Sequence, residues 1–162
     1  MFRTDDTIAA ISSAAGSAPR AIVRLSGPNA TALASDVFTS RRGTLAGMGG
    51  FRWTPGQVRL DRGHMAAELP ARAYVFRAPR SYTRQDIVEL HLPGPAAATG
   101  SVLHALLDAG ARQAEAGEFT ARAFFSGRID LSEAEAVADV IHAADAAGAR
   151  AAMACLRGRL RG

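Results

Sequence analysis

The sequence contains no lysine, because all 19 of its lysine-or-arginine positions are arginine. A phosphate-binding P-loop ends in Gly-Lys-Ser/Thr, and its lysine reaches the terminal phosphates of a nucleotide. This chain therefore cannot contain a P-loop, and it is not expected to bind or hydrolyse GTP. A codon bias toward arginine explains the missing lysines better than a functional need does.

Cysteine, metal-binding patterns and long apolar runs are also scarce. The single cysteine, Cys155, excludes an internal disulfide and a four-cysteine zinc site. The four histidines are scattered and form no His-Glu-x-x-His pattern, so no metal site is expected. No apolar run approaches the roughly 20 residues of a membrane span, and the charged residues of segment 1–6 do not resemble a signal peptide. We expect a cytoplasmic protein with no membrane contact.

What the chain does contain is enough apolar sequence for a folded core. Hydrophobic residues make up 48% of the 162 residues, which fits one domain or one domain plus a fragment. The formal net charge is +4. A basic surface of this size permits contact with RNA or with an anionic small molecule.

The apolar pattern predicts an α+β fold. Tyr-Val-Phe at 74–76 is typical of a strand, and Val102, Leu103, Leu106 and Leu107 have helical spacing. Strands are expected at 7–12, 21–25, 71–76, 86–92 and 112–116, with two short ones around Trp53 and Val58, and helices around 33–38 and at 99–107.

The last part of the chain predicts a long helix. Ser132 and Glu135 have the spacing of a capping box, and Gly127 suits the left-handed end of a short preceding helix. The long helix carries an apolar stripe that it cannot bury alone. We therefore expect residues 1–128 to form one domain, and residues 129–162 to open a helical domain completed elsewhere.

Two charges interrupt strands that are otherwise apolar. Arg24 lies within Ala-Ile-Val-Arg-Leu, and Glu89 lies within Ile-Val-Glu-Leu. A charge at such a position usually needs a partner. One interpretation is an ion pair across adjacent strands, which the spacing alone favours. The other is a polar ligand that both residues contact in a concave site.

Several segments occur together in the order of one known family. Gly-Glu-Phe-Thr-Ala-Arg-Ala-Phe begins at Gly117, Gly-Arg-Ile-Asp-Leu follows at Gly127, and Ala-Glu-Ala follows at Ala134. Earlier segments in family order are 6–11, 22–27, 78–83 and 86–90. Over most of residues 5–157 the chain resembles the tRNA-modifying GTPases called MnmE or TrmE, at their N-terminal end.

The resemblance implies a domain that binds a tetrahydrofolate one-carbon donor, such as 5-formyl-tetrahydrofolate, and forms a homodimer. Its fold would be similar to the folate-binding part of the aminomethyltransferase of glycine cleavage. Carried over by position, the folate contacts are Arg24, Glu89 and Arg128. No catalytic residue is implied within this chain. In the family, a flavin-dependent partner protein and tRNA take part in modifying carbon 5 of the wobble uridine.

The chain also departs from the family pattern. Arg128 stands where the family usually has lysine. The family's glycine-rich loops are replaced by bulkier residues at 16–20 and 91–97, which should border the ligand. These changes favour an alternative, a non-catalytic oligomerisation or RNA-binding module that keeps the fold. A stand-alone aminomethyltransferase-like enzyme would need its own acid, and no aspartate stands out for that role.

Two weaker candidates remain near these positions. Glu118 and Arg122, four residues apart, are interpreted as a surface pair on a helix. His91 should share a strand face with Glu89, since side chains alternate along a strand. We interpret it as a supporting or solvent-facing histidine rather than as an acid–base partner.

Overall fold

The computed structural model describes residues 4–13, 18–62, 65–143 and 145–159, and it divides into two compact units. The first unit ends at Ala114, and the second begins at Glu115. The mixed α and β architecture expected from the sequence is confirmed. Both the expected domain boundary after residue 128 and the likeness to a folate-binding aminomethyltransferase stay predictions.

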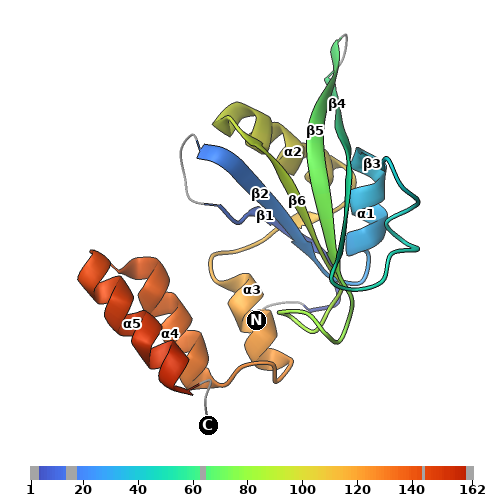
Figure 1. The fold of residues 1–162 in the computed structure, drawn as a ribbon. Helices are drawn as coiled ribbons and strands as arrows, with labels where there is room; N and C mark the ends of the chain where they lie inside the picture. The colour runs from blue at the N-terminus through green and yellow to red at the C-terminus, as the bar shows by residue number, and fades with distance from the viewer. Residues whose placement is uncertain (1–3, 14–17, 63–64, 144, 160–162) are drawn as a thin grey trace. The chain divides into compact units, whose positions relative to one another are not determined.

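The first unit is built on one sheet, and its described residues form seven strands in the order β3-β4-β5-β6-β2-β1-β7 (Figure 1). Neighbouring strands are antiparallel, except that β7 runs parallel to β1. The strands are β1 (Ile8–Ile11), β2 (Ala18–Ser26), β3 (Phe38–Ser40), β4 (Arg52–Arg62), β5 (Met65–Phe76), β6 (Ile87–Gly94) and β7 (Arg112–Gln113).

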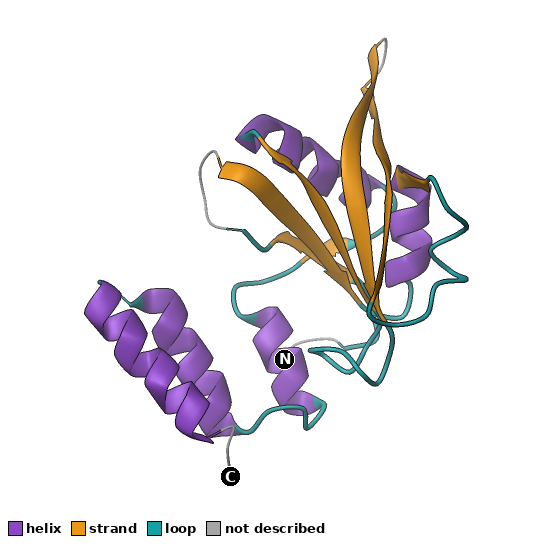
Figure 2. Cartoon of the chain, viewed as in Figure 1, coloured by secondary structure: helices purple, strands orange, loops and turns teal. Residues whose placement is uncertain are grey.

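Helices α1 (Ala30–Val37) and α2 (Ala96–Asp108) cover one face of this sheet (Figure 2). Apolar side chains alternate along the central strands and point to the helices, as period-two burial requires. Val23, Leu25 and Leu90 are fully buried against residues such as Val102 and Leu106 of α2. The main core cluster therefore lies on the helix side of the sheet, while Ile8 and Ile87, which both pair with Ser26, are buried on the opposite face.

The strands β4 and β5 form a hairpin that is longer than expected. Residues pair continuously from Arg52 opposite Val75 to Arg62 opposite Met65. The expectation of two short strands around Trp53 and Val58 was wrong. Pro55 and Gly56 lie between them and suggest a break, but Pro55 occupies a ladder position without ending the strand.

The segments 16–20 and 91–97 were expected to be loops, and this was wrong for most of the described part. Ala18 pairs with Gly94, and Ala21 pairs with Leu92, so β2 and β6 continue well past Arg24 and Glu89. The pairing register between β2 and β6 shifts between Ala18 and Ala21, as at a β-bulge, and Pro19 lies within this shift. Residues 16 and 17 lie outside the described part.

The second unit contains helices α3 (Glu118–Phe125), α4 (Leu131–His142) and α5 (Ala146–Arg159). The expected single long helix was wrong, because the backbone of Ala143 leaves the helical conformation at the end of α4, with φ of −57° and ψ of 123°. The carboxylate of Asp145 then accepts the N–H of Gly148 at 2.7 Å, as an N-cap does.

The capping box also lies two residues earlier than expected. The side chain of Asp130 accepts the N–H of Glu133 at 2.7 Å, and the Glu133 carboxylate accepts the N–H of Asp130 at 2.8 Å. Helix α4 therefore begins at Leu131. The expected left-handed glycine before it is confirmed, since Gly127 has a φ of 69°.

Glu118 and Arg122 in α3 are not a surface pair. The Glu118 side chain is 0% exposed and that of Arg122 is 1% exposed, with Oε1 of Glu118 and Nη2 of Arg122 3.0 Å apart. Spacing alone could not distinguish a solvated pair from a buried one. The same four-residue geometry serves both, and burial depends on tertiary packing.

Candidate functional site

The candidate site lies on the face of the sheet opposite α1 and α2, which we call the open face. Arg24, Glu89 and Tyr74 occupy one row across three neighbouring strands, because Arg24 pairs with Glu89 and Glu89 pairs with Tyr74. Their sequence neighbours Val23, Leu25, Val88 and Leu90 point into the core. Strand alternation thus places these polar side chains on the open face.

Arg24 and Glu89 form a direct ion pair across β2 and β6. Oε1 of Glu89 lies 2.9 Å from Nε and 2.7 Å from Nη2 of Arg24. The side chains are 29% and 14% exposed, so the carboxylate is largely shielded while the guanidinium reaches solvent. The ion pair that the spacing favoured is confirmed as a contact.

His91 supplies the second contact of the same carboxylate. Its Nε2 lies 3.0 Å from Oε2 of Glu89, so the expectation that the two residues share a strand face is confirmed. The imidazole also packs against the ring of Tyr74, with a centroid distance of 4.3 Å. Arg24, Glu89, His91 and Tyr74 therefore form one continuous polar and aromatic cluster.

The cluster continues toward β4 through stacked side chains. The rings of Tyr74 and Trp53 are stacked at a centroid distance of 6.2 Å. The guanidinium carbon of Arg72 lies 5.2 Å from the centre of the Trp53 ring, which is cation–π geometry. Trp53 is half-exposed at the margin of this surface.

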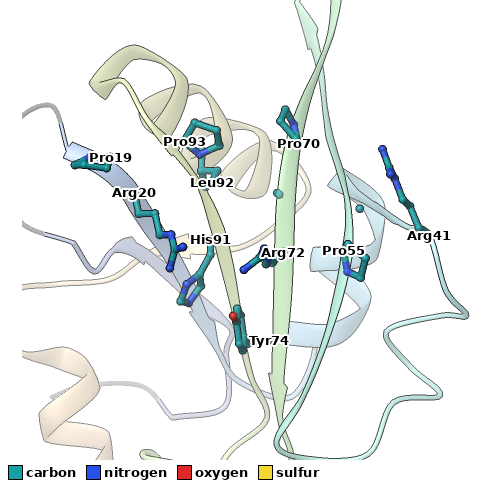
Figure 3. Close-up of a pocket in the computed structure, with 12 residues that line it drawn as sticks. Pro19, Arg20, Arg41, Pro55, Pro70, Arg72, Tyr74, His91, Leu92 and Pro93 are labelled. Carbon is teal, nitrogen blue, oxygen red and sulfur yellow. The ribbon is translucent and has the colours of Figure 1, made fainter.

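A pocket of about 350 Å³ opens beside the cluster and shares Tyr74 and His91 with it (Figure 3). We call it the arginine pocket. Residues of the segments 16–20 and 91–97 help to form it. Its described lining comprises Pro19, Arg20, Arg41, Pro55, Gly56, Pro70, Ala71, Arg72, Tyr74, His91, Leu92 and Pro93.

The structure brings together two of the three predicted folate contacts, Arg24 and Glu89. Arg128 belongs to the second unit, where it is exposed in the turn after α3 and its N–H donates to the carbonyl of Ala123 at 2.8 Å. Its place in a site with the other two residues stays a prediction. Sequence reasoning missed Tyr74, Arg72 and Arg20. The strand register alone places Tyr74 opposite Glu89 and Arg72 opposite His91, and Arg20 joins them only as part of the pocket lining.

Comparison with known proteins identifies the family of this chain. The sequence profile described as "GTP-binding protein TrmE N-terminus" matches residues 7–128. The chain belongs to the MnmE/TrmE family. It is 46% identical over 164 residues to the tRNA modification GTPase MnmE of Symbiobacterium thermophilum, and 47% identical over 156 residues to that of Geobacter sulfurreducens.

The MnmE of Bacillus subtilis is 42% identical over 156 residues. These matches cover 96–97% of this chain but only 34% of each relative, so the chain spans about a third of the length of the curated relatives it matches. The MnmE/TrmE resemblance inferred from the motifs is confirmed.

Two other kinds of feature are absent from the part of the chain that the structure describes. Within the described ranges, no group of three or more histidine, cysteine, aspartate or glutamate side chains could hold a metal ion. None of the helices formed by the described residues is long and apolar enough to cross a lipid bilayer.

Proposed function

We propose that this chain is the tetrahydrofolate-binding and dimerisation part of a tRNA-modifying GTPase, with 5-formyl-tetrahydrofolate or a related one-carbon derivative as its ligand. The observation that carries the proposal is the Glu89 carboxylate. It lies in the middle of the sheet on the open face, is 14% exposed, and is already oriented by Arg24 and His91. Membership of the MnmE/TrmE family supports the same assignment.

The donor and acceptor groups fit a pterin ring. A pterin presents an amino group and a ring N–H side by side, and a carboxylate can accept both. The two oxygens of Glu89 offer about four lone-pair positions. Arg24 takes two contacts on Oε1, and His91 takes one on Oε2.

Ligand binding on this account requires an exchange of partners. A bidentate pterin needs one acceptor position on each oxygen, so it must displace one of the two Arg24 contacts on Oε1. The released N–H of Arg24 can then donate to a carbonyl or formyl oxygen of the ligand. The bound folate supplies a one-carbon unit, while Arg24 and Glu89 hold and orient its ring.

Arg128 is proposed as the third contact, a donor to formyl or glutamate oxygens. The family usually has lysine at this position. Arginine keeps the charge but presents a planar fork in place of a compact ammonium. The homodimer, the flavin-dependent partner and the tRNA substrate belong to the same proposal, because they concern the whole family protein rather than this chain.

The test is calorimetric titration of 5-formyl-tetrahydrofolate into wild type, Glu89→Gln and the matched control Glu68→Gln. Glutamine at position 89 cannot accept both pterin donors. We expect a loss of about 1–3 kcal/mol in binding free energy, and no loss for the exposed Glu68 on β5.

Thermal melting of the same variants distinguishes ligand binding from a purely structural ion pair. Glutamine keeps an oxygen for Arg24, so we expect a stability change of about 1 kcal/mol or less. Weakened folate binding with a nearly unchanged melt supports the proposal. No detectable folate binding to well-folded wild type would overturn it and favour the non-catalytic module.

A further inference from the structure

The arginine pocket carries positive charge without a matching carboxylate. Its described lining includes Arg20, Arg41 and Arg72 together with His91, and it includes no aspartate or glutamate. In the part of the chain that the structure describes, none of these three arginines has a carboxylate oxygen within 4.0 Å. Clustered cations in a concave site raise the local positive potential and attract anions.

The arginines approach the pocket from different parts of the sheet, and Arg41 lies just after β3. Arg20 on β2 and Arg72 on β5 flank His91 on β6 (Figure 3). Arg72 is held over the ring of Trp53, so less freedom is lost when its N–H groups bind an anion. Four prolines in the lining stiffen the surrounding backbone, which lowers the cost of binding in the same way.

The pocket is continuous with the Glu89 cluster. His91 lines the pocket and also contacts Glu89 at 3.0 Å. The two residues are two positions apart on β6, which corresponds to about 7 Å along a strand. A volume of about 350 Å³ is at the lower end of the roughly 300–1,000 Å³ of small-molecule sites. The pocket therefore fits one end of an extended ligand whose other end lies at Glu89.

We propose that the arginine pocket binds the γ-linked glutamyl tail of a polyglutamylated folate. The tail is a flexible chain of carboxylates, and arginine pairs with carboxylates through parallel N–H···O bonds. This inference rests on the proposed function, since it places the pterin of the same ligand at Glu89. Single-stranded RNA fits less well, because base stacking needs a free aromatic face and Arg72 already covers Trp53.

The experiment compares 5-formyl-tetrahydrofolate carrying one glutamate with the same compound carrying five, titrated into the full chain at low salt. We expect wild type to bind the pentaglutamate about tenfold more tightly or better. The double variant Arg20→Gln/Arg72→Gln should reduce this preference to less than about threefold. The control Arg59→Gln, an exposed arginine on β4 outside the pocket lining, should keep it.

A γ-linked pentaglutamate peptide without a pterin is the second probe. We expect it to bind wild type weakly, to compete with the pentaglutamate, and to lose binding in the double variant. Equal affinity of wild type for the two folates overturns the tail site and leaves the proposed function standing. If neither folate binds, the proposed function fails. In that case the peptide alone tests the pocket. Peptide binding that is lost in the double variant supports an anion site formed by Arg20 and Arg72, and no peptide binding overturns it.

A tRNA titration of the same variants completes the set. Loss of tRNA affinity in the double variant, with the pentaglutamate preference intact, would assign the pocket to RNA and contradict the inference. Thermal melts establish that the double variant is folded, which we expect because both arginines are exposed.

Discussion

Replacing Arg122 by methionine removes a cationic partner of the fully buried Glu118 carboxylate. Glu118 and Arg122 are 0% and 1% exposed, and Oε1 and Nη2 lie 3.0 Å apart. At an effective dielectric constant of about 20, two unit charges at this distance attract by roughly 5 kcal/mol. Breaking a buried pair by removing one partner typically costs about 3–5 kcal/mol.

We therefore expect Arg122→Met to lower the free energy of unfolding by about 3–5 kcal/mol. For a chain of this size, each kcal/mol corresponds to about 2–4 °C in Tm, so the melt should shift by at least about 6 °C. Glu118→Gln should have a similar effect. It keeps an acceptor for the N–H of Glu115, which now binds Oε2 of Glu118 at 2.9 Å, but it removes the negative charge that lies 3.0 Å from the Arg122 guanidinium.

The double variant Glu118→Gln/Arg122→Met removes both charges, and we expect it to be closer to wild type than either single variant. Glu135→Gln, an exposed position on α4, should change stability by less than about 0.5 kcal/mol. Urea and thermal unfolding measure the stability of wild type and all four variants. Single variants that cost less than about 1 kcal/mol, or costs that simply add in the double variant, would refute the buried pair as a strong interaction.

Three further outcomes are expected. The purified chain should show no saturable GTP binding or hydrolysis, because it has no lysine to complete a P-loop; measurable turnover in a phosphate-release assay would contradict this. Sedimentation equilibrium at micromolar concentration should give about twice the chain mass of 16.9 kDa, whereas a strict monomer would argue against the homodimer. Gly27→Ala should lower stability by more than about 2 kcal/mol, because φ is +144° there and a Cβ would lie 2.5 Å from Cα of Thr7; an unchanged melt would show that this turn can relax.

Local patterns in the sequence predicted most strands and both helices of the first unit. The Tyr-Val-Phe segment identified the second half of β5 by its strand propensity, and helical spacing identified α2 because that pattern follows directly from one buried face. The alternation of side chains along a strand placed Glu89 and His91 on one side of β6, which their 3.0 Å contact confirms.

Features that depend on pairing between distant segments could not be predicted in this way. The neighbours of Glu89 are set by the register of three strands, so Tyr74 and Arg72 gave no signal on their own. The Arg77 side chain is a second example. It donates to the carbonyls of Leu45, Ala46 and Met48 and so fixes the loop before β4. No local sequence motif predicts this role.

The end of the chain shows why helix boundaries were misplaced. Ser132 and Asp130 both have a glutamate three residues later, so two capping boxes were compatible with the sequence. The structure uses Asp130 and Glu133. The break after His142 depends on Asp145, whose side chain caps α5 by accepting the N–H of Gly148. In the sequence, an aspartate among alanines is also compatible with a continuous helix, so this contact could not be predicted.

A crystal structure of this chain grown with 5-formyl-tetrahydrofolate tests the proposed Glu89 site most directly. We predict the pterin ring on the open face, with its amino and ring N–H groups about 2.7–3.2 Å from the two oxygens of Glu89 and one Arg24 contact released to the ligand. A folate bound elsewhere, or a Glu89 carboxylate that keeps all of its present contacts with Arg24 and His91 while folate is bound, would contradict it.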